Sequence, residues 1–92
     1  MLKVRYSARF KRDFKAVIKR GYDTVVFEKV VGLLREEKPL SEKYRDHDLT
    51  GNYIGHRSCH LASDWLLIYK VEQDILTLTL TRTGTQSDLY KK

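Results

Sequence analysis

The sequence lacks the features that stabilise a protein with disulfides or anchor it in a membrane, and each absence excludes a class of protein. Its single cysteine, Cys59, cannot form a disulfide within the chain. No stretch has the length and apolar character of a signal peptide or a membrane helix. We see no internal repeat and no low-complexity segment. We therefore expect one cytoplasmic domain, residues 1–92, without membrane contact, whose modest core requires neither disulfides nor a structural metal.

Acidic side chains are almost missing from the first fifth of the chain. Up to Arg20 the only acid is Asp13, against eight basic residues: Lys3, Arg5, Arg9, Lys11, Arg12, Lys15, Lys19 and Arg20. From Gly21 onward basic and acidic residues nearly cancel, so the N-terminal segment carries the whole net charge of +6. A localised positive surface attracts polyanions such as nucleic acid or an acidic protein segment. The alternative is that the charges only keep a helix face solvated.

Periodicity assigns the N-terminal half to one strand and two helices. Residues 2–6 alternate apolar and charged side chains, which predicts a short strand with one buried face. Ser7 is a suitable N-cap for a helix over residues 8–20, whose opposite faces are apolar and basic. Asp23 can cap a second helix that ends near Glu37. The short link predicts an antiparallel helix pair that needs a further surface to bury its apolar side.

The C-terminal half has the pattern of a sheet. Residues 53–62 predict a strand or a strand pair, and residues 65–72 a strand. In the last predicted strand, 75–81, leucines alternate with threonines, so one face should pack on the helices while the threonine face stays wet or binds a ligand. A short helix follows over residues 87–90. The fold class is therefore α+β, with a short N-terminal strand and two antiparallel helices packed on a C-terminal antiparallel sheet.

The stretch from Tyr44 to Lys70 concentrates the unusual chemistry, since it holds all three histidines, the cysteine and the tryptophan. His47, His60 and Asp64 are suited to proton transfer, and two histidines can share the acid and base roles that transesterification of an RNA phosphodiester requires. Cations stabilise the anionic phosphorane that forms in this reaction, and the candidates are Arg57 and Arg82, with Lys70 behind them. Trp65 and Tyr90 are candidates for stacking on a base.

Each of these candidates also has an ordinary structural interpretation. Taken singly, His47 can be a loop residue, His56 a surface residue and Trp65 a core residue. A zinc site is disfavoured, because the histidines and Cys59 lack a paired-ligand spacing and because Cys59 and His60 should point to opposite faces of a strand. No recognised elbow supports a cysteine or serine nucleophile. From the residues alone we expect a basic α+β domain with a candidate phosphodiester site.

Four linked motifs closely resemble the YafQ branch of the RelE/ParE toxin superfamily: Tyr44-Arg45-Asp46-His47-Asp48-Leu49 followed by Gly51, Arg57-Ser58-Cys59-His60, Asp64-Trp65-Leu66-Leu67-Ile68-Tyr69-Lys70 and Arg82-Thr83-Gly84-Thr85. The resemblance covers nearly the whole chain and implies a RelE-like, microbial-RNase-like fold. It implies a bacterial toxin that cuts mRNA in the ribosomal A site, with the 2′-OH as nucleophile and without a metal or other cofactor. It further implies a DinJ/RelB-type antitoxin as partner, and contact with operator DNA only through the toxin–antitoxin complex.

Carried over by motif, the family's catalytic positions fall on His47, His60 and Asp64. Its tryptophan falls on Trp65, its phosphate-side arginine on Arg82 and its C-terminal aromatic on Tyr90. One position departs from the pattern, since Gln86 stands where the family has a further catalytic histidine. Glutamine can hydrogen-bond a phosphate but cannot exchange protons near neutral pH. Three alternatives follow from Gln86. The chain is a natural variant that relies on His47, His60 and Asp64, or it is a toxin inactivated by substitution, or it is a protein that binds its antitoxin but hardly cleaves RNA.

Two function classes follow. The first is a ribonuclease toxin whose basic helix face binds ribosomal RNA through Arg9, Arg12, Lys15 and Lys19. The second is a non-catalytic basic module of the same fold, either an antitoxin partner in an operator-binding complex or a gyrase inhibitor of the ParE kind. The set His47, His60 and Asp64 favours the first class, whereas Gln86 favours the second.

Overall fold

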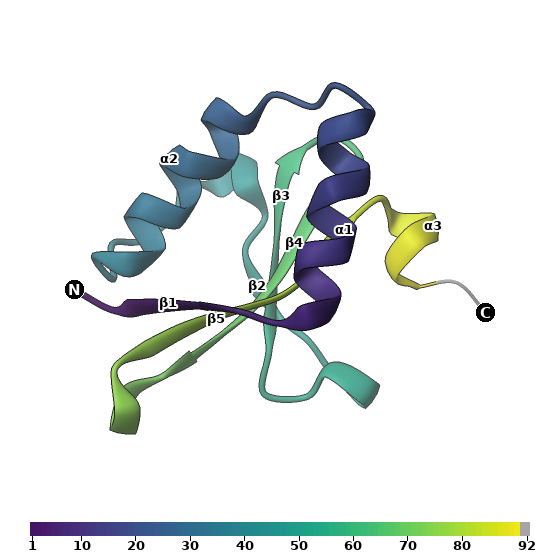
Figure 1. The fold of residues 1–92 in the computed structure, drawn as a ribbon. Coiled ribbons are helices and arrows are strands. Elements are labelled where there is room, and N and C mark those ends of the chain that lie inside the picture. The colour runs from purple at the N-terminus through teal and green to yellow at the C-terminus, as the bar shows by residue number, and fades with distance from the viewer. Residues whose placement is uncertain (91–92) are drawn as a thin grey trace.

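A computed structural model describes residues 1–90 of the chain. Its strands are β1 (Lys3–Tyr6), β2 (His47–Asp48), β3 (Arg57–Ala62), β4 (Trp65–Glu72) and β5 (Thr77–Gly84), and its helices are α1 (Ala8–Lys19), α2 (Thr24–Arg35) and α3 (Gln86–Leu89). Two helices run in opposite senses over one face of the sheet and diverge from their linker (Figure 1). The predicted α+β class is confirmed.

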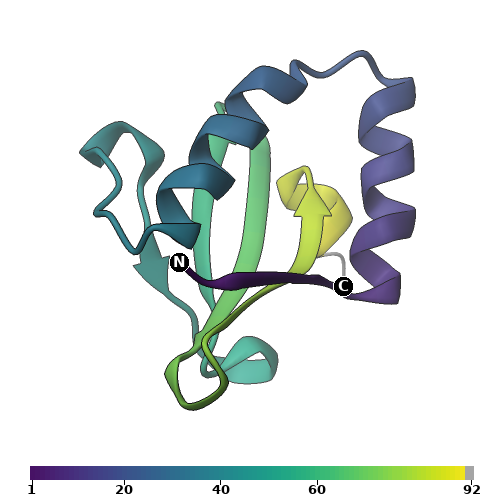
Figure 2. The same cartoon turned by 60° about the vertical axis from the view of Figure 1, so that its left-hand side comes forward.

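The five strands form one mixed sheet in the order β1-β5-β4-β3-β2. The strands from β2 to β5 are antiparallel to their neighbours, as predicted, whereas β1 joins the edge of β5 in parallel, with Lys3 opposite Thr77 and Tyr6 opposite Leu80. Figure 2 shows β1 lying along β5 below the two helices. The first and last strands of the chain are therefore neighbours, and the helix pair connects β1 at one edge of the sheet to β2 at the other.

Local signals set the helix ends. The Ser7 side chain accepts a hydrogen bond from the Phe10 amide at 2.9 Å, and the Asp23 side chain accepts one from Val25 at 3.0 Å. Both are N-caps that satisfy otherwise unpaired backbone N–H groups. The second helix ends at Arg35, before the predicted Glu37, and Glu37 adopts a left-handed conformation with φ of 59°.

The main core lies between the helices and the sheet. It gathers the inward side chains of both helices and of β3, β4 and β5, and includes Phe10, Val17, Phe27, Val30, Val31, Leu34, Cys59, Leu61, Trp65, Leu67, Tyr69, Leu78 and Leu80. Burying these apolar side chains removes them from water and supplies the dominant stabilisation. The predicted leucine face of the last strand is confirmed at Leu78 and Leu80, but Leu76 is 58% exposed in the turn before β5.

The opposite face of the sheet, which we call the open face, is only partly covered. Leu66 and Ile68 of β4 form a second apolar cluster there with Leu89 of α3, and Leu49 and Tyr53 pack against it. The predicted wet threonine face is only partly correct, because Thr77 is 7% exposed. The short helix α3 and the segment before β3 thus form two walls on the open face, above the middle of β3 and β4.

Candidate active site

A pocket of about 250 Å³ lies on the open face between those walls. It is lined by His47, Leu49, Thr50, Ser58, His60, Leu66, Gln86 and Tyr90. These residues come from four separate segments of the chain, which only the folded sheet brings together. The two histidines that the sequence singled out as proton-transfer groups therefore line a single cavity.

His60 owes its place to the alternation of β3. Residues 58 and 60 point to the open face, whereas Cys59 is fully buried in the main core at 0% exposure. The prediction that Cys59 and His60 point to opposite faces is confirmed. Burial raises the pKa of the Cys59 thiol to about 12, which keeps it protonated and unsuited to act as a nucleophile. Ser58 lines the pocket although sequence reasoning did not select it, and its spacing of two from His60 was the available signal.

His47 approaches the pocket from β2, which pairs with β3 so that His47 lies opposite Ser58. Its Nδ1 lies 2.7 Å from the backbone oxygen of Arg45. A carbonyl oxygen can only accept, so Nδ1 carries a proton and Nε2 of the neutral ring is the free acceptor. The ring therefore presents the nitrogen that a general base requires.

Gln86 and Tyr90 enter the pocket from α3. The backbone N–H of Gln86 donates to Asp64 Oδ1 at 3.0 Å, which fixes the start of α3 beside the turn between β3 and β4. Asp64 itself does not line the pocket. The Tyr90 ring packs edge-on against Tyr53, with centroids 6.3 Å apart, and burial raises the pKa of its phenol. The structure thus places Gln86 in one pocket with His47 and His60, with Asp64 holding its backbone N–H.

Arg82 lies beside the pocket. Its Nε donates to Asp13 Oδ2 of α1 at 2.7 Å, the side chain is 12% exposed, and Nη1 lies 3.4 Å from the Tyr53 hydroxyl. The hydrogen bonds to Asp13 raise the pKa of a guanidinium that is already always charged. Sequence reasoning missed Asp13 as its partner, although Asp13 is the only acid in the N-terminal segment. Arg82 also lines a groove of about 440 Å³ between α1 and α3, together with Arg12 and Arg20.

The prediction that Arg57 is a cation for the phosphorane does not agree with the position of Arg57 in the structure. Arg57 lies opposite Tyr69, a residue of the main core, and alternates with Ser58, so its side chain leaves β3 on the helix side of the sheet. There it forms ion pairs with Asp46 and Asp48. A guanidinium on the other side of a sheet cannot contact a phosphate in the pocket.

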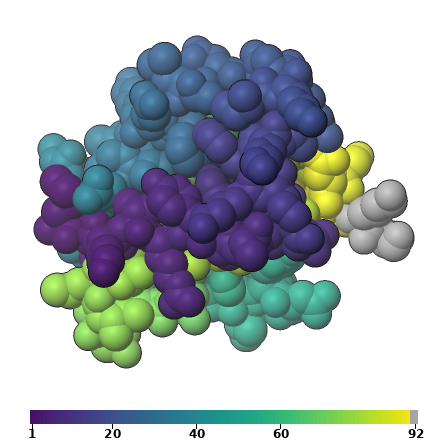
Figure 3. All heavy atoms as spheres, in the orientation of Figure 1, coloured from purple at the N-terminus to yellow at the C-terminus, as the bar shows by residue number. Residues whose placement is uncertain are grey.

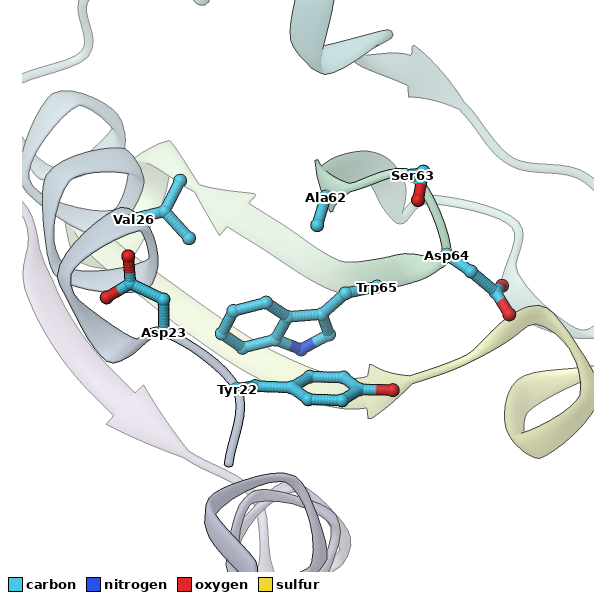
Figure 4. A pocket seen from close by; sticks show the side chains of 7 residues that line it. All are labelled: Tyr22, Asp23, Val26, Ala62, Ser63, Asp64 and Trp65. Carbon is cyan, nitrogen blue, oxygen red and sulfur yellow. The ribbon is translucent and has the colours of Figure 1, made fainter. Parts of the chain in front are cut away.

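The prediction that Trp65 stacks on a base is also wrong. Trp65 is 2% exposed, and its Nε1 donates to the Thr83 hydroxyl at 2.8 Å. Figure 4 shows the indole beside Tyr22 in a small apolar pocket, with the Asp64 side chain pointing away from it toward α3. The core interpretation of Trp65 is therefore the correct one.

The basic residues of α1 lie outside the pocket. Arg9, Arg12, Lys15 and Lys19 are all exposed. In the space-filling view, β1 and α1 cross the middle of one face of the molecule, with α2 above them and the β4–β5 hairpin below (Figure 3). Lys70 is partly buried and leaves β4 on the open face, two residues beyond Ile68, so it lies farther along the sheet than the pocket.

Metal-ligand clusters and membrane-spanning helices are both absent from residues 1–90. Among these residues, no three histidine, cysteine, aspartate or glutamate side chains converge as metal ligands would. No helix in this part of the chain is both long and apolar enough to cross a bilayer.

Residues 2–91 match the sequence profile of the family described as the bacterial toxin of type II toxin-antitoxin systems, YafQ. The mRNA interferase toxin YafQ of Escherichia coli K12 is 35% identical over 88 residues, which cover 95% of this chain and 94% of that protein. A metal-bound toxin from Helicobacter pylori is 43% identical with a TM-score of 0.91, over 97% of this chain and 99% of the other. YafQ in the E. coli DinJ-YafQ complex is 34% identical with a TM-score of 0.88, over 98% and 99% of the two chains.

Fold and site together define a small α+β protein with a pocket on the open face of its sheet that brings two histidines together. The profile match and the near-complete coverage then identify its family. The chain belongs to the YafQ family of toxins of type II toxin–antitoxin systems.

Proposed function

We propose that this chain is a ribosome-dependent endoribonuclease of the bacterial cytoplasm, which cuts mRNA in the A site through attack of a ribose 2′-OH. One observation carries the proposal: His47 and His60, from two different strands, line the same pocket. The name of its E. coli relative, mRNA interferase toxin, supports the same activity. A purely structural role would not require two titratable rings to share a polar cavity.

The pocket offers groups for each step of the reaction. His47, with Nε2 free, removes the proton from the 2′-OH, and His60 protonates the leaving 5′ oxygen. Arg82 supplies positive potential beside the pocket, where negative charge develops on the phosphorane. Asp64 acts through the Gln86 amide by fixing the start of α3. Tyr90, which is 39% exposed, offers a ring on which a base can stack. No step of this mechanism uses a metal.

The proposal is tested by single-turnover cleavage of mRNA on ribosomes programmed with a defined A-site codon. His47→Ala and His60→Ala should each slow cleavage by about 10²- to 10⁴-fold, the usual contribution of a general acid or base. His56→Ala is the matched control, because His56 packs against Tyr53 and does not line the pocket. Chelation by EDTA, with ribosome integrity maintained, should leave the rate unchanged. Equal rates for all three variants, at intact fold, would refute the assignment.

A second candidate function rests on Gln86. A toxin-fold protein whose pocket has an amide at this position can bind its antitoxin and the ribosome without cutting. The same assay separates the two functions, because a binding module would bind ribosomes at ordinary affinity and leave the mRNA intact.

We propose further that the basic face of α1 binds ribosomal RNA. Its charges are at the surface, and Arg12 also lines the groove between α1 and α3, in which Arg20 and Arg82 are paired with Asp88 and Asp13. Charge reversal of Lys15 and Lys19 should weaken ribosome binding and reduce the dependence of log K on log salt by roughly 0.7 for each phosphate that the variant no longer neutralises. Reversal of Lys29 and Lys38 is the control, since both are exposed on or after α2. Equal salt slopes in the two variants would show that α1 is only a solvated surface.

The antitoxin of the DinJ/RelB type is proposed to cover the same face. Beside the basic residues, a groove of about 340 Å³ between the helices is lined by aromatic rings and one lysine: Tyr6, Phe10, Phe14, Phe27 and Lys11. An acidic amphipathic segment would place apolar side chains in this groove and carboxylates on the basic rim. The complex should then fail to bind ribosomes. Formation of a toxin–antitoxin–ribosome assembly at the affinity of the free toxin would exclude this mode of inhibition.

A further inference from the structure

His47 lies on a strand that gives it little support. Strand β2 has two residues, both exposed, and the residue two positions before His47, Arg45, is in the left-handed conformation with φ of 48°. Such a conformation is unfavourable for a residue other than glycine, and a short exposed segment opens easily. Acid–base catalysis nevertheless requires the ring to be held accurately, because misplacement by about 1 Å can lower a rate roughly 10²-fold. Something outside β2 must fix it.

The support comes from the two aspartates that flank His47 in the sequence. In an extended segment, residues 46 and 48 point to the side opposite residue 47. On that side Arg57 donates from Nε and Nη2 to Asp46 at 3.3 and 3.1 Å, and from Nη1 to Asp48 at 2.6 Å. The Tyr69 hydroxyl also donates to Asp46. One guanidinium thus holds both neighbours of His47 from the far face of the sheet.

The contacts with Asp46 matter more than the contact with Asp48. The Asp46 side chain is 24% exposed, whereas the Asp48 side chain is 84% exposed, and exposed ion pairs contribute little. Hydrogen bonding to Asp46 raises the pKa of Arg57, and burial raises the pKa of Tyr69, so both groups remain donors at every physiological pH. Tyr69 is itself 2% exposed, which ties the cluster to the main core.

The cluster therefore connects the core to the ring of His47. With Asp46 fixed, Arg45 on one side and His47 on the other have fixed backbones, and the Arg45 carbonyl can hold the proton on Nδ1. We propose that Arg57 is a positioning residue, which acts through Asp46 to hold His47 in the Nδ1–H form with Nε2 free for catalysis. The catalytic part of this inference rests on the proposed ribonuclease function.

The test uses Arg57→Gln and Asp46→Asn, with two independent measurements. Imidazole ¹⁵N NMR of the free toxin reports which ring nitrogen of His47 is protonated, and does not depend on activity. Both variants should lose the Nδ1–H signature and show the mixture of forms typical of a mobile histidine. In single-turnover assays the cleavage rate should fall roughly tenfold to a hundredfold, while the ribosome dissociation constant and its salt dependence stay unchanged. Lys38→Gln, which breaks the exposed ion pair with Glu36, is the control and should change nothing.

Two results would overturn the proposal. An unchanged His47 signature in either folded variant would show that the cluster does not position the ring. Weaker ribosome binding with a shallower salt slope in Arg57→Gln would instead make Arg57 a phosphate ligand. Should both variants fail to fold, Arg57→Lys keeps the positive charge but loses the planar fork that bonds Asp46 through Nε and Nη2, and an unchanged signature there would equally refute the proposal. A parent chain that shows the Nδ1–H signature but cleaves no mRNA would disprove the proposed function alone.

Discussion

Replacing Gln86 with histidine tests whether the pocket lacks one proton-transfer group. Gln86 is exposed, lies at the first position of α3 and lines the pocket with His47 and His60. Its backbone position is set by the Asp64 carboxylate and by the capping box of Thr85 and Asp88. None of these contacts involves the glutamine side chain, so an imidazole can replace the amide without disturbing the fold.

The expected gain is large. A well-placed general acid or base contributes about 10²- to 10⁴-fold, which corresponds to a lowering of the activation free energy by roughly 2.7 to 5.5 kcal/mol. Gln86→His should therefore raise the single-turnover rate of A-site mRNA cleavage by a factor in that range. Its pH–rate profile should also gain the ionisation of the new histidine. In the parent chain, His60→Ala should remove much of the residual activity.

The matched control is Ser87→His. Ser87 follows Gln86 in α3 but lines the groove next to Arg12 and Asp13, so its imidazole adds the same chemistry outside the pocket. We expect no increase in rate for this variant. A parent chain that already cleaves fast, with no gain from Gln86→His, would refute the reasoning and assign proton transfer to His47 and His60 alone.

Three further predictions concern stability and reactivity. Thr83→Val keeps the side-chain shape but leaves the buried Trp65 N–H without an acceptor, so urea unfolding should show a loss of about 1–3 kcal/mol, and an unchanged midpoint would contradict this. The hydrogen bond from Arg20 lowers the pKa of Asp88 to about 2, so the stabilisation from this carboxylate is present above its ordinary pKa of 3.8 and is lost as the pH falls toward 2. Unfolding of Asp88→Asn should therefore depend less on pH in that interval, and unfolding curves identical to those of the parent would disprove this prediction. Cys59 should resist a thiol reagent in the native state and react fully in denaturant, whereas rapid native labelling would show that the core opens.

The helices were predictable because their signals are local. Caps at Ser7 and Asp23 lie within three residues of the amides they satisfy, and the apolar spacing of each helix is complete within the helix itself. The parallel pairing of β1 with β5 was not predicted. Its partners, such as Lys3 and Thr77, are far apart in the sequence, and nothing in either strand alone specifies the other.

In the site, the alternation of β3 and β4 is a better guide than residue type. It correctly separated His60 from Cys59. Applied one step further, the same alternation would have put Arg57 on the core side with Cys59, and Trp65 there with Leu67. Both wrong assignments came from residue type, since arginine and tryptophan suit RNA binding, whereas the geometry of a strand decides which face each of them occupies. The cluster of Asp46, Arg57 and Tyr69 depends on contacts across strands and had no local signal.

The break in pairing between β4 and β5 has a consequence for how this protein tolerates change. Ile68 pairs with Arg82 but Tyr69 pairs with Leu80, so Thr81 is an extra residue in β5. Before it, even-numbered residues such as Leu80 face the core; after it, Thr83 does. Thr81 is therefore a β-bulge residue that shifts the alternation of faces by one position for the residues after it. Deleting Thr81 would leave Leu80 and Thr83 facing the core and Arg82 facing away from it, because the strand would then alternate regularly. Pairing Thr81 in a regular register would instead turn the Arg82 charge into the core and Thr83 out to water, so the bulge itself is what keeps both residues on their faces.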